Sequence, residues 1–210
     1  MATKLSVYRG ALLIIKQRPI DALTDTDKSR YILDAVYDRA KALALEQGYW
    51  NFATRTVSID SSVDVEPTFG FSYVFDKPDD WVSSAALAAN EIFYPPLGVG
   101  EFVDEGIYIH ANCDPLYLSY VSDGTSYGGD LSLWSASFER YFEHELAERI
   151  APHLTTMGRD EFNELAKDKK RALYTALAKD AKNQAAQALP PGRLVRSRMG
   201  GNRAAFQKVT

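Results

Sequence analysis

The chain has 210 residues, of which 46% are hydrophobic and 25% are charged. This length allows one large domain or two small ones, and the composition is ordinary for a soluble globular protein. The lone Cys113 excludes an internal disulfide, and the longest apolar run, residues 11–15, is too short to cross a bilayer. Because the N-terminus also lacks the order of a signal peptide, we expect the protein to stay in the cytoplasm where it is made.

The charge is distributed unevenly along the chain. The net charge is −4, but residues 190–210 contain five basic and no acidic side chains, so residues 1–189 carry −9. An acidic body argues against a protein that grips nucleic acid over its whole surface. The last segment also contains two prolines and three glycines, which favours a flexible basic arm over a packed element.

Two helices are predicted before residue 48. Thr3 is placed to cap a helix over residues 4–17, where apolar residues recur at helical spacing, and the proline after Arg18 ends it. A second helix is predicted over residues 30–47, with Gly48 in the stop position.

From Tyr49 the hydrophobic period changes to alternation, which is typical of strands. Four strands are predicted, over residues 51–60, 68–75, 106–111 and 116–121. The last two are joined by the turn residues 112–115, so we expect them to form a hairpin within one small antiparallel sheet.

Two consecutive helices are predicted over residues 135–154 and 159–189. The first has one apolar stripe, made by Phe138, Tyr141, Phe142, Leu146, Ile150 and Leu154. The second has a similar stripe and is rich in alanine, which lets a neighbouring helix approach closely. At about 1.5 Å per residue it would be roughly 45 Å long, so we expect one side of it to meet another molecule.

These elements predict an α+β protein that is mainly an α-helical bundle with long C-terminal helices and an inserted small antiparallel β-domain. The predicted bundle comprises residues 1–48 and 135–189, the inserted β-domain residues 49–134, and the flexible basic arm residues 190–210.

Several residue groups could suggest chemistry, but each has a plainer interpretation. His144 and Glu148 begin like a zinc-protease motif, yet Glu148 stands where the second histidine must be, which favours a solvated surface pair. The neighbours His110, Cys113 and Asp114 lack an accompanying oxyanion-hole motif.

Other groups have equally plain interpretations. The adjacent acids Asp79 and Asp80 are typical of a turn, where such side chains bond the local backbone. The aromatic residues of 69–75 have no interleaved basic residues, which favours core packing over base stacking, and the glycine-rich loop 122–130 lacks the Lys-Ser/Thr of a phosphate-binding loop. We therefore expect no enzyme activity, no cofactor and no metal.

Several stretches resemble, in their order and spacing, the head-to-tail adaptor proteins of tailed bacteriophages, the group often called tail tubular protein A. The matching parts lie in residues 11–23, 46–55, 69–81, 107–121 and 134–155. The most recognisable pieces are the Trp50-Asn51-Phe52-Ala53 step and the Pro78-Asp79-Asp80-Trp81 turn. The resemblance covers about residues 8 to 190, although Lys77 replaces the family's usual leucine before the turn proline.

The resemblance implies a structural virion protein at the head-tail junction. Such proteins form rings of about twelve copies under the portal protein, connect it to a tail nozzle or tube protein, and leave a channel through which viral DNA passes without specific binding. Under this hypothesis no membrane is involved, and the basic arm orders against the portal through residues Arg193, Leu194, Val195, Arg196, Arg198, Arg203 and Phe206.

Two other interpretations of the arm stay open, a merely solubilising tail and a DNA-contacting segment. The second would suit a small DNA-binding or packaging accessory protein. A hydrolase is a further alternative, because a likeness in architecture does not exclude a grafted activity.

Overall fold

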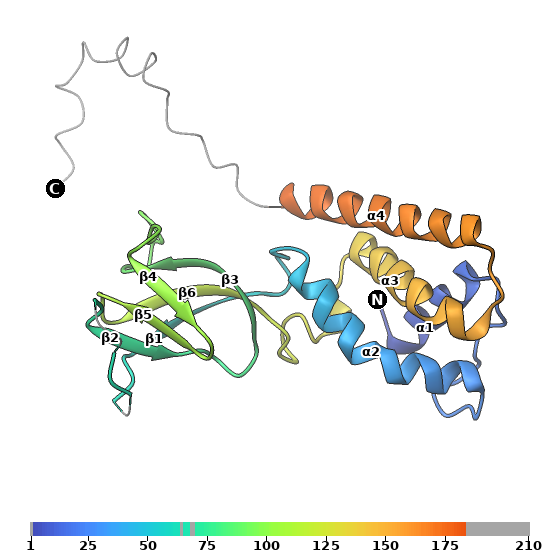
Figure 1. Ribbon diagram of the computed structural model, residues 1–210, viewed down its shortest axis with the longest axis horizontal. Coiled ribbons are helices and arrows are strands. Elements are labelled where there is room, and N and C mark those ends of the chain that lie inside the picture. Colours follow the sequence, from blue (N-terminus) through green and yellow to red (C-terminus); the bar gives the residue numbers. More distant parts are fainter. Residues whose placement is uncertain (1, 64, 68–69, 184–210) are drawn as a thin grey trace, which may run out of the picture.

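The computed structural model describes residues 2–63, 65–67 and 70–183. Within these residues four α-helices gather at one end of the molecule and six strands at the other (Figure 1). We call these regions the helical end and the β end. No helix in the described part of the chain is both long and apolar enough to cross a membrane.

The first two helices follow the predicted pattern closely. Helix α1 spans Lys4–Ile14, and the Thr3 side chain caps it by accepting a hydrogen bond from the Ser6 backbone. It ends earlier than predicted, because Lys16 has a left-handed backbone with φ of 58° and the Gln17 amide turns back to the Leu12 carbonyl. Helix α2 spans Lys28–Glu46 and is capped by Asp27.

The third and fourth helices form the predicted consecutive pair. Helix α3 spans Ala136–Leu154 and helix α4 spans Arg159–Ala181. The predicted stripe on α3 is confirmed, because five of its six residues are buried and Leu154 is partly buried. The residues from 184 to 189 of the predicted second helix lie outside the described residues.

The strands form two antiparallel sheets of three strands each. The first sheet, in the order β1-β6-β3, consists of Thr54–Ile59, Leu116–Ser122 and Trp81–Ala88. The second sheet, in the order β2-β5-β4, consists of Tyr73–Asp76, Tyr108–Ala111 and Phe102–Glu105. A short 3-10 helix, Leu131–Leu133, precedes α3.

The predicted hairpin between residues 106–111 and 116–121 is wrong. Strands β5 and β6 belong to different sheets. The side chains of Phe75 and Ile109 from one sheet share a buried cluster with Leu116 and Leu118 from the other. The turn at residues 112–115 therefore carries the chain from one sheet to the next, because burying both apolar faces against each other removes more apolar surface from water than one open sheet would.

The helical end has its own, larger core. Trp50 is only 1% exposed; its indole N–H donates to the Ala44 carbonyl at 3.0 Å, and its ring meets that of Phe138 edge-on at 4.7 Å. The same cluster contains Ala53 and Val121, which flank or belong to the first sheet. The helical core thus continues into the strands that lie beside it.

These findings correct the predicted fold class. The described chain is α+β with four helices and two small three-stranded sheets, and a long-helix bundle with an inserted β-domain is not what it forms. Helix α3 is no longer than α2, at 19 residues each. The prediction failed because hydrophobic periodicity identifies individual helices and strands but does not determine how many sheets the strands form. It also does not determine whether the core of the helices extends into those strands.

Candidate functional site

The portal-binding residues predicted from the sequence, which run from Arg193 to Phe206, lie outside the described residues. The predicted basic arm over residues 190–210 does so as well, and it stays a prediction. The described residues do include the histidine, cysteine, acidic and aromatic side chains for which chemistry was considered above.

In the turn from Pro78 to Trp81, the carboxylate of Asp80 accepts three side-chain hydrogen bonds. The donors are the Tyr120 hydroxyl at 2.8 Å, the Arg55 guanidinium at 3.0 Å and the Ser122 hydroxyl. Burial alone would raise the pKa of this carboxyl, but these three donors outweigh it and hold the pKa below its ordinary value. Asp80 therefore bonds distant side chains, where the sequence had predicted contacts with the local backbone.

The neighbours His110, Cys113 and Asp114 each engage a different partner. The His110 side chain is buried, with its Nε2 3.4 Å from a Glu105 carboxylate oxygen. Asp114 accepts hydrogen bonds from the amide and hydroxyl of Ser61. Burial raises the pKa of the Cys113 thiol, which disfavours the reactive thiolate. The Cys113 side chain is partly buried and packs against the cluster between the two sheets.

The prediction that His144 and Glu148 form a solvent-exposed pair is wrong. His144 is buried at 9% exposure between α3 and α4, and Glu148 forms an ion pair with Lys169 on α4. Lys169 also lies 3.3 Å from Glu145, whose other oxygen accepts from Arg149 at 2.7 Å. Among the described residues, no three His, Cys, Asp or Glu side chains are placed to hold a metal ion.

The aromatic row of residues 69–75 is only partly a core. Phe75 is fully buried and Phe71 partly buried, but Tyr73 is exposed and Phe69 lies outside the described residues. Strand β2 begins only at Tyr73, after Gly70 with φ of 94°, and within it the adjacent Val74 and Phe75 are both buried while Tyr73 is exposed, so the alternation is not kept.

A surface that the sequence analysis missed lies on strand β4 and its flanking loops. Within residues 92–107 the structure exposes five of the thirteen large apolar side chains that are exposed in the described chain: Ile92, Tyr94, Val99, Val103 and Ile107. We call these five residues the apolar tip. Strand β4 is an edge strand at the β end (Figure 1), and Val99 from the preceding loop forms a parallel bridge with Phe102 at its start.

One feature of the sequence indicates the apolar tip. Residues 89–101 form an irregular connection that contains two prolines and two glycines, and large apolar side chains on such a connection have no regular element to bury them. Several large apolar side chains exposed within one short stretch favour a site of protein interaction.

The two ends of the molecule are joined by a polar contact between Asn51 and Asp180. The Asn51 backbone amide donates to the Asp180 carboxylate at 3.1 Å, and the Asn51 side-chain amide donates to the Asp180 carbonyl at 2.7 Å. The last turn of α4 is thus fixed to the residues that lead into β1.

No protein-family model matches this chain, and no curated protein matches it at a significant level.

Proposed function

We propose that the chain is a non-enzymatic structural protein of a phage virion, a head-to-tail adaptor that forms a ring between portal and tail. The resemblance of the quoted stretches to such adaptors suggests it, and the apolar tip is the observation that carries it. Ile92, Val99 and Ile107 are 83%, 108% and 67% exposed respectively. Burying each such side chain against a partner is worth about 1.5 to 3 kcal/mol, so a lasting partner is favoured.

The separation of the two ends suits an adaptor. The apolar tip lies at the β end and the four helices lie at the other (Figure 1). A part that links two assemblies needs different surfaces at its two ends, together with a side-to-side contact that repeats until a ring closes. The partners in this proposal are the portal protein, a tail nozzle or tube protein and further copies of the chain.

The residues that carry the resemblance have architectural roles in the described structure. Trp50 fills the helical core, Asn51 joins the two ends, and Asp80 ties the turn to strand β6. Positions used for packing and hydrogen bonding in this way are the ones that a structural protein needs.

The charge of the chain fits passage of DNA without binding. Residues 1–189 carry −9, and negative walls repel phosphates, so a genome would slide along such walls without sticking. The proposed location is the head-tail junction of the virion, after synthesis in the host cytoplasm.

Light scattering on the chain, with and without purified portal complex of the same phage, tests the proposal. We expect the 23.4 kDa chain to add to the portal as a ring of about twelve copies. A chain that stays monomeric beside portal would contradict the proposal. Retention on DNA that disappears when residues 190–210 are removed would favour a DNA-binding accessory protein instead.

A pair of matched variants tests the apolar tip. Val99→Ser should weaken assembly with the portal, the tail protein or other copies by roughly tenfold or more, since each 1.4 kcal/mol of lost contact energy is a factor of ten. Val63→Ser changes the same residue type at 99% exposure in the β1–β2 connection and should assemble normally. Equal assembly by both variants in all three binding assays would exclude the apolar tip from the interface.

A further inference from the structure

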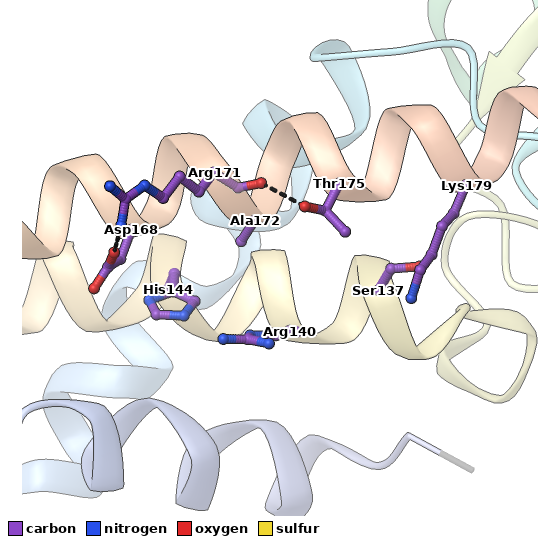
Figure 2. Close-up of a pocket in the computed structure, with 8 residues that line it drawn as sticks. All are labelled: Ser137, Arg140, His144, Asp168, Arg171, Ala172, Thr175 and Lys179. Carbon is purple, nitrogen blue, oxygen red and sulfur yellow. Dashed lines mark hydrogen bonds and ion pairs between the residues drawn. The ribbon is translucent and has the colours of Figure 1, made fainter.

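A groove runs between helices α3 and α4 on the surface of the helical end. The two helices are joined by a short turn and lie side by side (Figures 1 and 2). The groove has a cavity volume of about 290 Å³. Ala172 and His144 line it and are buried, whereas Arg140, Thr175 and Lys179 are exposed along it.

The spacing of the lining residues follows the helices. On α3 the contributing positions are Ser137, Arg140 and His144, and on α4 they include Arg171, Thr175 and Lys179. Separations of three and four residues place side chains on one face of a helix, so each helix directs one polar row toward the other. Figure 2 shows Arg140 below the short side chain of Ala172, with Lys179 reaching from α4 toward Ser137.

The groove is cationic although the body of the chain is acidic. Three permanently basic side chains line it, and its one carboxylate, Asp168, already accepts a hydrogen bond from Arg171 at 3.3 Å. Within the described part of the chain, neither Arg140 nor Lys179 forms an ion pair or a side-chain hydrogen bond. Two cations without an ion-pair partner beside one cavity favour an anionic ligand.

The buried histidine supplies an independent observation. His144 lines the groove at 9% exposure, and its Nδ1 has no hydrogen-bond partner among the described residues. Among the described residues, Arg30 Nε, the Tyr37 hydroxyl and His110 Nδ1 are also buried without a partner, but of these four atoms the one on His144 belongs to a residue that lines the groove. A buried polar group without a partner calls for a bound ligand, ion or water, or for a functional role.

We propose that the α3–α4 groove binds a small phosphate-class oxyanion, either free phosphate or a phosphate monoester, with Arg140 and Lys179 as its main contacts. The planar guanidinium can bond two oxygens of a tetrahedral anion, the ammonium a third, and the Ser137 hydroxyl is a further donor. The Thr175 hydroxyl already donates to the Arg171 carbonyl at 2.8 Å, so it is not needed as a donor. The acidic charge of residues 1–189 disfavours a long polyanion such as duplex DNA.

Titration of the full chain with inorganic phosphate tests this site, with chloride at matched ionic strength as the reference. Amide resonances of Ala172 and Thr175 should shift and saturate. Arg140→Gln and Lys179→Gln should each weaken the binding roughly tenfold, because each removes a charge-assisted hydrogen bond. Arg18→Gln removes an exposed arginine elsewhere, with 85% of its side chain exposed, and should bind as the unaltered chain does.

Asp168→Asn should change the affinity for phosphate in the opposite direction. It removes the Asp168 carboxylate from the groove and releases Arg171, so phosphate should bind several-fold more tightly. Circular dichroism and the melting temperature in chloride check that each variant is folded. Identical titrations for the unaltered chain, Arg140→Gln and Lys179→Gln, or an equal response to acetate, would overturn the proposal.

Two further probes identify the source of the phosphate group. Adenosine monophosphate should compete with inorganic phosphate in the same titration, whereas a short DNA duplex should not. Binding of the duplex that depends on Arg140, with no saturable response to phosphate or the nucleotide, would overturn the assignment of a small ligand. None of these outcomes depends on whether the chain assembles with a portal.

Discussion

The helical end and the β end are held together in different ways. The buried apolar cluster of the helical end contains 26 residues, including an edge-on chain of rings formed by Trp50, Phe138 and Trp134. The cluster between the two sheets contains seven residues, and beside it Asp80 gathers three hydrogen-bond donors. The helical end thus has the larger buried core, whereas at the β end the hydrogen bonds of Asp80 lie beside a smaller one.

The exposed surfaces of the two ends also differ in chemical character. The β end exposes the apolar tip, while the helical end carries the cationic groove between α3 and α4. An end with little core of its own, next to an exposed apolar surface, has the most to gain from a partner. The following substitutions test this contrast, beginning with the two tryptophans.

Trp50→Ala should be the most damaging change at the helical end. It removes a side chain that is 1% exposed and contacts Phe138, Tyr141 and Phe52. Substitutions of this kind lower the free energy of unfolding by about 3 to 5 kcal/mol, because a cavity remains. Denaturant unfolding followed by far-ultraviolet circular dichroism measures it without relying on tryptophan emission.

Trp81→Ala is the matched change at the β end. Trp81 is only partly buried, its indole N–H donates to the Ser84 hydroxyl at 3.0 Å, and the Lys77 ammonium lies 3.9 Å from its ring centroid. We expect a loss of about 1 to 2 kcal/mol, since less apolar surface is buried. Equal losses for the two tryptophans would contradict the difference between the cores.

Asp80→Asn should lower the free energy of unfolding by about 2 kcal/mol at pH 7. The carboxylate is an acceptor for three donors, and the neutral amide leaves at least one of them poorly paired. The neighbour Asp79 is exposed and has no side-chain hydrogen bond or ion pair within the residues that the structure describes, so Asp79→Asn should leave stability nearly unchanged. Thermal melting of both variants makes the comparison.

The pH dependence of the Asp80 effect has a definite sign. Because the folded state lowers the pKa of Asp80 below 3.8, its contribution is present above that value and is lost as the pH falls through the folded pKa. The difference between the unaltered chain and Asp80→Asn should therefore shrink below about pH 4. A difference that stays constant from pH 7 to pH 3 would show that the contribution does not come from the charged carboxylate.

Glu143→Gln should stabilise the helical end slightly at alkaline pH. Glu143 lies against Gly10 of α1, where a Cβ atom would collide with its carboxylate. Burial and the nearby Glu139 raise the pKa of Glu143 to about 7, despite the opposing charge of Arg140. A raised pKa means that the stability of the unaltered chain falls as the pH rises from about 4.5 through about 7.

At pH 8 we expect Glu143→Gln to gain about 1 kcal/mol, less than the whole shift implies because the carboxylate remains partly solvated. Below about pH 4.5 the two chains should have nearly equal stability. Glu164→Gln, at an exposed position on α4, is the control and should show no such pH dependence. A gain in Glu143→Gln that is the same at pH 4 and pH 8 would argue against titration of Glu143.

The helices were predictable from sequence because each carries its own local evidence. The stripe from Phe138 to Ile150 repeats every three or four residues, and Thr3 and Ser135 stand where caps are needed. Strand β3 was missed for a physical reason. Register shifts between Trp81 and Ser83 and between Ser84 and Ala86 break the alternation that marks a strand.

The arrangement of the strands and of the groove depends on contacts far apart in sequence. The residues 112–115 predict a turn, but not whether the flanking strands pair in one sheet or face each other. The groove was also missed, although Ser137, Arg140 and His144 share one helical face and Arg171, Thr175 and Lys179 share another. The antiparallel packing of α3 on α4 brings these two polar rows together. A search for hydrophobic periodicity finds apolar stripes and does not detect polar rows.

The Asn51–Asp180 contact has a mechanical consequence. Tension applied along α4 toward its C-terminal end would reach the residues before strand β1 directly through Asp180, in addition to the apolar contacts of α4 with the helical core. The strain would then be shared by the hydrogen-bond ladder between β1 and β6, which resists shear by loading many bonds at once. A pull at this helix end would thus be borne jointly by a helix and a sheet.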